Sequence, residues 1–303
     1  MAISRGQLVK ELEPGLNALF GLEYKRYENQ HAEIYTTESS DRAFEEEVML
    51  SGFAQAQTKS EGAGVAFDNA QETYTARYTH ETIALAFSIT EEAIEDNLYD
   101  RLASRYTKAL ARSMANTKQV KAVAPLINGL PTNDAFDSGD GVSLFNTSHP
   151  TIAGTVSNTL GTQADLNETS LEQSLIDIAA MTDERGLKIA ARGVKMIIPS
   201  ELQFTAERLM KSQGRVGTAD NDVNAIVSMG MIPQGYRVNN FLTDTDAFYI
   251  MTDVPNGMKY FERAPIKTAM EGDFDTGNVR YKARERYSFG VSDYRGIFGV
   301  EGA

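Results

Sequence analysis

Residues 53–64 read FAQAQTKSEGAG and residues 73–79 read TYTARYT, and these two stretches decide the fold. The first is poor in large aliphatic side chains and ends in a glycine-rich tip, while the second alternates with a period of two. Together they predict a long hairpin within residues 51–87. A lone two-stranded ribbon is marginally stable in water, so this hairpin should lie against something else. Residues 83–87 (IALAF) then alternate as a strand with one buried face.

A long helix is expected directly after the hairpin. Ser88 and Glu91 have the spacing of a capping box, and Pro125 and Gly129 should bound the far end. From Glu91 to Ala124 the helix would span roughly 50 Å at the usual rise per residue. One apolar residue recurs at every fourth position along it. The members of this stripe are Ile94, Leu98, Leu102, Tyr106, Leu110 and Met114.

The N-terminal part is expected to be a weakly anchored arm. Leucines at near-helical spacing over residues 6–22 are interrupted by Pro14 and Gly15, which predicts two short helical pieces with a bend. Residues 30–41 are polar and indicate an extended connecting segment. The sequence begins without the apolar stretch of a signal peptide, and no apolar run reaches membrane-spanning length, so we expect a soluble intracellular chain.

A compact α+β region is expected in the middle of the chain. Residues 131–165 are rich in Asn, Asp, Gly, Ser and Thr and indicate irregular surface chain. The elements expected after it are a helix from about Asn167 to Gly186, a buried strand at 194–199, a helix opening at Pro199, and strands at 236–239 and 247–252.

Long strands are expected again from Met258 onward, and their charge pattern is unusual. Odd positions from Val279 to Val291 are mostly apolar, whereas basic residues occupy even positions. Glu285 should therefore point to the face opposite the basic one. A solvated face, a nucleic-acid patch and a set of inter-subunit ion pairs are all compatible with this pattern. The basic residues are Arg280, Lys282, Arg284 and Arg286.

Composition excludes several classes of function. The 303 residues contain no cysteine, which removes disulfides, thiolate metal sites and cysteine nucleophiles. Asp and Glu number 42 against 29 Lys and Arg, giving a formal charge of -13 that repels polyphosphate. The chain is therefore not expected to read nucleic acid, and any contact with DNA should be enclosure.

Each catalytic template fails on a residue type or a spacing. His31, His80 and His149 lie far apart and form no metal-binding pair, so surface or hydrogen-bonded structural roles are expected. Residues 214–218 (GRVGT) lack the lysine of a phosphate loop. Residues 273–278 (DFDTGN) carry glycine at the fifth position of a calcium loop instead of the sixth, and should form a turn. We expect no catalytic residue, no cofactor and no metal.

The order of arm, ribbon, long helix, α+β region and terminal strands resembles the Hong Kong 97 fold of tailed-phage major capsid proteins. The segments that look most like phage head subunits are 110–115 (LARSMA), 139–150 (GDGVSLFNTSHP), 208–212 (RLMKS), 217–222 (GTADND), 270–275 (MEGDFD) and 284–287 (RERY). The resemblance implies an α+β fold in four parts. These are an N-terminal arm (1–45), an extended loop (46–88), a peripheral domain containing the spine helix (89–127 and 263–303) and an axial domain (128–262).

The resemblance also implies a function. The chain would be a non-enzymatic shell subunit that self-assembles as pentamers and hexamers in the host cytoplasm, enters the virion and encloses double-stranded DNA. A portal, a decoration protein and a separate scaffolding protein are candidate partners, because the arm begins almost at Met1 and leaves no room for an internal scaffold. Scaffold-free assembly is the alternative. Rival functions are an encapsulin-like nanocompartment shell and a soluble enzyme with an unrecognised site.

Some relatives weld a loop lysine to an asparagine of the terminal strands with the help of a glutamate. Lys59, Asn278 and Glu285 look similar in position to these three residues. The reaction needs a desolvated amine beside an activated amide and a carboxylate that takes the proton. The alternative is that Asn278 ends a turn and Glu285 pairs with a neighbouring arginine. The candidate inter-subunit contacts are Lys59, Arg77, Asn278, Arg280, Lys282, Arg284, Glu285 and Arg286.

Overall fold

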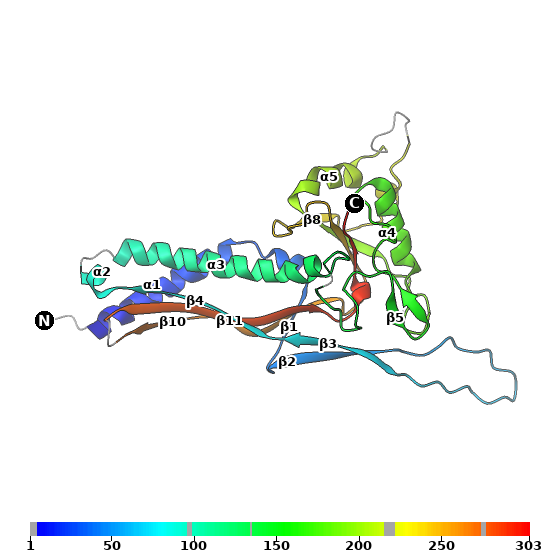
Figure 1. The fold of residues 1–303 in the computed structure, drawn as a ribbon, viewed down its shortest axis with the longest axis horizontal. Helices are drawn as coiled ribbons and strands as arrows, with labels where there is room; N and C mark the ends of the chain where they lie inside the picture. The colour runs from blue at the N-terminus through cyan, green and yellow to red at the C-terminus, as the bar shows by residue number, and fades with distance from the viewer. Residues whose placement is uncertain (1–4, 96–98, 134, 215–221, 274–276) are drawn as a thin grey trace.

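The computed structural model describes residues 5–95, 99–133, 135–214, 222–273 and 277–303. Figure 1 shows an elongated base in which helices lie along a sheet, and a head that stands at one end of this base. A hairpin projects beyond the base and beneath the head. Within the described residues, none of the helices has the apolar length that crossing a bilayer needs.

The sheet of the base has the order β1-β10-β11-β4. Its strands are β1 (Thr36–Ser39), β10 (Met258–Gly272), β11 (Val279–Val291) and β4 (Glu81–Ile89). β1 runs parallel to β10, and the other neighbours are antiparallel. The expected strand at residues 83–87 and the terminal strands are confirmed, although Leu85 remains 46% exposed on the edge strand β4.

The N-terminal segment is one helix, α1 (Arg5–Arg26), which continues through Pro14. The prediction of two pieces with a bend was wrong, and so was the prediction of weak anchoring. Leu16 and Phe20 are buried against α3 (Tyr99–Asn128) and the base sheet. Burying each such side chain contributes about 1.5–3 kcal/mol, enough to offset the roughly 3 kcal/mol cost of an interior proline.

The helical region begins at Glu91 and ends at Asn128, just before Gly129, as predicted, but Ser88 and Pro125 do not have the expected roles. Ser88 belongs to β4, and the N–H of Ala93 instead meets Thr90 Oγ1 at 3.4 Å at the start of α2 (Glu91–Glu95). Pro125 lies inside α3, so it does not end the helix. Leu126 is completely buried one residue later, and this packing favours continuing the helix to Asn128.

The apolar stripe of α3 is partly as expected. Leu110 and Met114 are buried, but Tyr106 is 49% exposed, and Ala103 and Thr107 take the inward positions. A four-residue repeat drifts by about 40° per step around a helix with 3.6 residues per turn, so one series cannot stay on one face. The side chains of Ile94, Leu98 and Leu102 lie outside the described residues.

The hydrogen-bonded stem of the hairpin consists of β2 (Phe44–Leu50) and β3 (Glu72–Thr79). The returning strand was predicted correctly, whereas the outgoing strand lies before residues 53–64. The N–H of Ser51 donates to the carbonyl of Gln71 at 2.8 Å. Residues 51–71, which follow the stem, form neither helix nor strand. The large side chains of this segment, Phe53, Val65 and Phe67, are exposed and do not pack on a neighbouring element, so little holds a ladder together here.

The head contains a second sheet of order β12-β9-β7-β8. Its elements are β12 (Ile297–Val300), β9 (Phe248–Thr252), β7 (Gly193–Ile198), β8 (Tyr236–Val238), α4 (Glu168–Ala180), η2 (Ser200–Leu202), α5 (Gln203–Lys211), α6 (Ala225–Met229) and η3 (Tyr294–Gly296). The expected helices and strands are present, and Asn167 caps α4. Gly186 lies in a later turn, so it does not stop that helix. β12 takes residues 297–300 out of the base sheet, so the expected segment 263–303 is divided between the two sheets.

Two segments that were expected to lie outside the core contribute to it. Residues 30–41 form η1 (Gln30–Glu33) and β1, and the neighbouring Ile34 and Tyr35 are buried. Residues 131–165 are irregular apart from β5 (His149–Thr151) and β6 (Gly154–Val156), but Leu144, Phe145, His149 and Asn158 are completely buried. The surface prediction was wrong because polar composition does not reveal hydrogen bonds made inside the protein.

Candidate assembly surfaces

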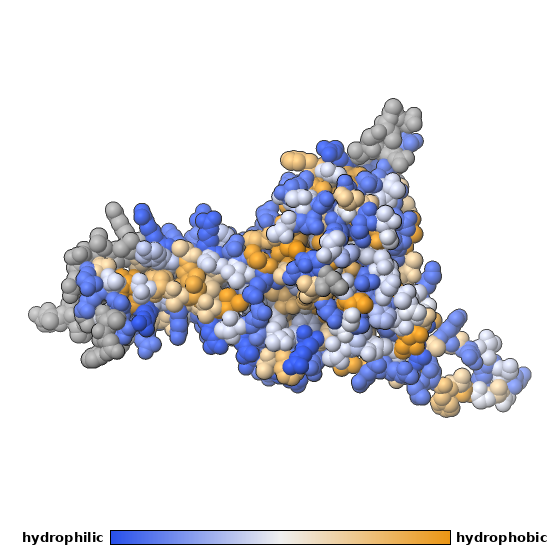
Figure 2. Space-filling view, viewed as in Figure 1, coloured by the Kyte–Doolittle hydropathy of each residue, from blue (hydrophilic) through white to orange (hydrophobic). Residues whose placement is uncertain are grey.

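The loop of residues 51–71 exposes apolar side chains. Figure 2 shows apolar residues on the hairpin where it stands away from the head. Phe53, Val65 and Phe67 are 61%, 68% and 97% exposed. Lys59 lies on the same loop and is also exposed. Apolar side chains gathered on a protruding segment are typical of a surface that a partner covers.

An ion cluster around the buried Lys259 fastens the stem of the hairpin to the base sheet. Lys259, on β10, pairs with Glu38 of β1 at 3.0 Å and with Glu47 of β2 at 2.5 Å. Burial alone would lower the pKa of Lys259, but hydrogen bonds to Glu47 and Glu38 outweigh it and raise the pKa above its usual value. Neither the sequence patterns nor the resemblance singled out Lys259.

Arg77 interacts within its own hairpin. Its Nε lies 3.7 Å from Glu46 Oε1, and its guanidinium carbon lies 4.1 Å from the centre of the Phe44 ring. Both partners belong to β2, opposite Arg77 on β3. The candidate contact residue therefore has intramolecular partners, although its side chain is 57% exposed.

The four basic residues of β11 lie as the alternation predicted, on the face of the strand opposite Glu285. Arg280, Lys282 and Arg284 are exposed, whereas Arg286 is half-buried. Arg280 pairs with Asp273 at 2.5 Å, and Arg286 Nη2 donates to the carbonyl of Ala43 at 3.5 Å.

Lys282 and Arg284 differ from the other two basic residues. In the described part of the chain, no carboxylate of the same subunit pairs with either of them. Lys282 lies between Ala86 and Ala269, whereas Arg284 lies between Ala84 and the exposed Lys267. Lys267, Lys282 and Arg284 thus place three cations close together on one face of the sheet.

Glu285 is an internal residue. Its carboxylate lies 3.3 Å from Lys118 Nζ of α3 and accepts a hydrogen bond from the Tyr24 hydroxyl at 3.2 Å. Burial raises the pKa of Glu285 in spite of the neighbouring ammonium group. It pairs with a cation, but with Lys118 and not with the expected arginine neighbour. Asn278 closes a turn, since its carbonyl accepts from the N–H of Asp273 at 2.8 Å.

The three histidines are buried and hydrogen-bonded. His31 contacts Gln119, His80 lies between Ser40 and Ser288, and His149 contacts Asp140 and Asn158. Burial and the Lys118 charge lower the pKa of His31 to about 4, although the bond with Gln119 opposes this. All three have the hydrogen-bonded structural role that was expected. His149 and Asp140 lie within the segment 139–150 that carried the resemblance, which is the only signal the sequence offered.

No metal centre is apparent in residues 5–95, 99–133, 135–214, 222–273 and 277–303, where no three His, Asp or Glu side chains converge suitably. The GRVGT segment lies almost entirely outside the described residues, as does the middle of the DFDTGN turn. The described surfaces, with a protruding loop, exposed apolar side chains and unpaired cations, are those of a structural protein that associates with other chains.

Comparison with known proteins identifies the family to which this structural protein belongs. The model of the phage capsid protein family matches residues 73–300. The chain therefore belongs to the phage capsid protein family, as a structural major capsid protein with the Hong Kong 97 fold that assembles with copies of itself into the virion shell. Family membership makes it a shell component, not an enzyme, and does not favour the nanocompartment alternative. No curated protein matches the chain in sequence.

Solved structures show the same fold at low identity. The capsid of an empty GTA particle gives a TM-score of 0.59 at 15% identity, covering 90% of this chain and 89% of that one. The capsid of the cyanophage P-SCSP1u gives 0.57 at 12% identity, covering 89% and 86%. A virus-like particle from Pyrococcus furiosus gives 0.55 at 9% identity, covering 95% and 98%.

Proposed function

We propose that the subunit builds the head shell by packing residues 51–71, the outer part of its extended loop, against a neighbouring copy. The observation that supports this is the exposure of Val65 and Phe67, which find no cover in their own subunit. Fully burying such a side chain contributes about 1.5–3 kcal/mol. A shell repeats the contact many times, so a modest gain at each interface has a large effect on assembly.

The basic strip of β11 is the second proposed contact. Lys282 and Arg284 would meet carboxylates of the neighbouring subunit, with Arg280 and Arg286 beside them. Like charges on one strand face repel each other unless anions lie between them. Lys59, Arg77, Asn278 and Glu285 remain candidate contacts. Of these, Glu285 has the weakest case, because its carboxylate is buried and pairs with Lys118.

The wider assignment follows the same order of parts. We propose an arm (1–45), an extended loop (46–88), a peripheral domain (89–127 and 263–303) and an axial domain (128–262). Within 263–303, β12 pairs with the sheet of the head and not with that of the base. The subunits would form pentamers and hexamers in the host cytoplasm, with a separate scaffolding protein, a portal and a decoration protein as partners. Because the chain carries a charge of -13, the wall should enclose DNA without binding its sequence.

Shortening the loop tests the proposed function. Replacing residues 57–69 by a tight turn should leave the thermal melting of the subunit almost unchanged, because Val65 and Phe67 are the only large apolar residues removed. Particle yield, measured by sedimentation and electron microscopy, should fall at least tenfold. A matched variant keeps the loop length and changes only Val65→Ser and Phe67→Ser. Normal particles from both variants, or an unfolded shortened subunit, would contradict the proposal.

A further inference from the structure

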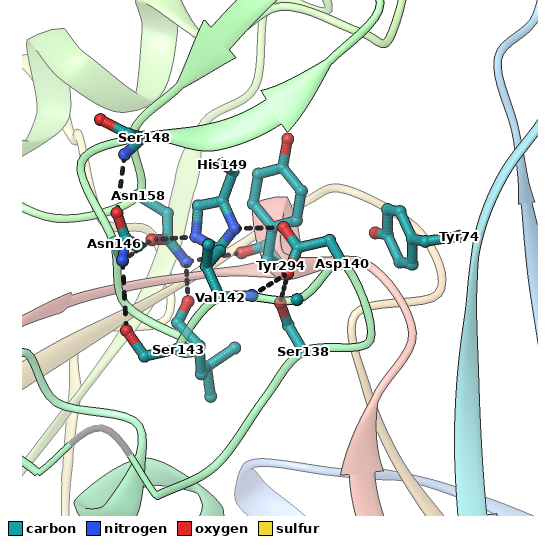
Figure 3. A network of polar contacts seen from close by, with 12 residues as sticks. Tyr74, Ser138, Asp140, Val142, Ser143, Asn146, Ser148, His149, Asn158 and Tyr294 are labelled. Carbon is teal, nitrogen blue, oxygen red and sulfur yellow. Dashed lines mark hydrogen bonds and ion pairs between the residues drawn. The ribbon is translucent and has the colours of Figure 1, made fainter.

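A buried polar network lies beside the base of the hairpin (Figure 3). At its centre is His149, which has no exposed surface. Its Nδ1 lies 2.6 Å from Asp140 Oδ2, and its Nε2 lies 3.0 Å from Asn158 Oδ1. The aromatic ring of Tyr294 stacks on the imidazole with centroids 3.7 Å apart and planes 5° from parallel.

The orientation of Asn158 determines which group faces His149 Nε2. Asn158 Nδ2 donates to the carbonyls of Leu144 at 2.7 Å and Tyr294 at 3.1 Å, while Oδ1 also accepts from the N–H of Asn146 at 3.0 Å. Turning the amide around would lose these bonds. Both imidazole nitrogens therefore face hydrogen-bond acceptors, and only the doubly protonated ring can donate to both.

The partner of His149 Nδ1 is the carboxylate of Asp140, which is almost completely buried. Burial by itself would raise the pKa of Asp140, but hydrogen bonds from His149 and Ser138 outweigh it and hold the pKa below its usual value. His149 and Asp140 thus form a buried hydrogen-bonded pair.

Gly139, next to Asp140 in the chain, and Tyr294, stacked on His149, connect the pair to the hairpin. Gly139 has a φ of 98°, and a Cβ there would lie 3.0 Å from the carbonyl of Thr75 and 3.1 Å from Ala76 Cα, so the loop backbone touches β3 closely. The Tyr74 ring lies 6.5 Å from the Tyr294 ring that stacks on His149. The network therefore contacts β3 at residues 74–76.

The other strand of the stem, β2, is separated from the head at its end. A cavity of about 350 Å³ separates the end of β2 at Met49 and Leu50 from Glu184, Asp253 and Arg295 of the head. Near the head, the hairpin is therefore held by what touches β3, including the loop that Asp140 holds, and by Arg185, whose Nη2 donates to the carbonyl of Asn69 at 2.6 Å.

We propose that the His149–Asp140 pair positions the extended loop. It sets the direction in which the hairpin projects from the base and the head. Its consequence for assembly rests on the proposed function, in which the loop must reach a neighbouring subunit. Loss of either partner removes the hydrogen bond between His149 Nδ1 and Asp140 Oδ2 that holds residues 138–142 in place.

The charged groups around the pair give the pH dependence. Arg295 lies 4.5 Å from the Tyr294 ring and pairs with Asp293 and Glu184. Burial raises the pKa of Asp293 and, further, those of Tyr74 and Tyr294, so both tyrosines stay neutral. Because the pKa of Asp140 lies below its usual value, falling pH should release the hairpin only when it becomes low enough to protonate Asp140.

Distances between spin labels in the unassembled full-length subunit test this inference. The chain has no cysteine, so Glu72→Cys at the outer end of β3 and Ile176→Cys on α4 give one label pair. At neutral pH the distance distribution should be narrow. Asp140→Asn should broaden it at least twofold, whereas Glu201→Gln, a neutralised carboxylate outside the network, should not.

A second variant separates positioning from general stability. His149→Gln removes the other partner of the pair and should broaden the distribution to the same extent as Asp140→Asn. If Asp140→Asn does not fold, His149→Gln decides alone, and a distribution that stays narrow in it overturns the inference. A narrow distribution in folded Asp140→Asn overturns it too, whatever the shell yield. Broadening with normal shells would instead count against the proposed function.

Discussion

Lys118 Nζ on the spine helix α3 lies 3.3 Å from Glu285 Oε2 on β11, and the two side chains are 12% and 1% exposed. The ammonium also lies 5.1 Å from the ring centres of both Tyr260 and Tyr287. This pair joins the helix layer to the sheet layer in the middle of the base. Its position makes Glu285 a residue of subunit stability, although the resemblance implied a role between subunits.

Removing one partner of this pair should be worse than removing both. Lys118→Met leaves the Glu285 carboxylate buried without its cation, which should cost about 3–5 kcal/mol. The double variant with Glu285→Gln should recover at least half of that loss, because no buried charge remains. Urea unfolding of the subunit at pH 7 measures both. A double variant as unstable as the single one would show that packing, not charge, explains the effect.

Charge reversal on the basic strip should affect assembly more than folding. Lys282→Glu and Arg284→Glu should lower shell yield several-fold while changing subunit melting little, because both side chains are exposed and unpaired within the described subunit. Lys282→Arg and Arg284→Lys keep the charge and serve as controls. Assembly of the parent should also slow with added salt. Shell yield that ignores both reversal and salt would remove this strip from the interface.

A methyl group at Gly290 should disturb the docking of the hairpin. A Cβ there would lie 2.6 Å from Tyr78 Cε1, so the stem or β11 must shift, at a cost of about 1–3 kcal/mol. Gly272→Ala is the control, because that strand glycine has nothing within 4 Å of an added Cβ. Thermal melting compares the two variants. Equal melting temperatures would indicate that the stem moves without cost.

His31 should make the subunit sensitive to acid. Its pKa in the folded state is lowered from 6.5 to about 4. The unfolded chain therefore binds the proton more readily, and stability is lost as pH falls from about 6.5 towards 4. The loss attributable to His31 should be about 2 kcal/mol at pH 5. Urea unfolding at pH 7 and pH 5 measures it, with His31→Gln as the comparison. A variant with the same pH dependence as the parent would exclude His31 as the cause.

The sequence alone determined those features that depend on neighbouring residues. Strand alternation identified β3, β4 and β11 and assigned Glu285 to the face opposite the basic residues, because consecutive side chains must alternate in an extended chain. The start of α4 at about Asn167 followed in the same way. The absence of cysteine and the acidic charge excluded whole classes of chemistry before any fold was considered.

Tertiary structure decided wherever long-range packing outweighed a local preference. Pro14 and Pro125 break helices in isolation, yet both lie inside helices here because Leu16, Phe20 and Leu126 are buried on neighbouring elements. Glu285 and Lys118 are 167 positions apart, so no spacing rule could join them. Polar composition hid the burial of His149 because Asn158 and Asp140 satisfy it within the fold. Local patterns carry no information about such contacts, since their energy appears only when distant segments exclude water together.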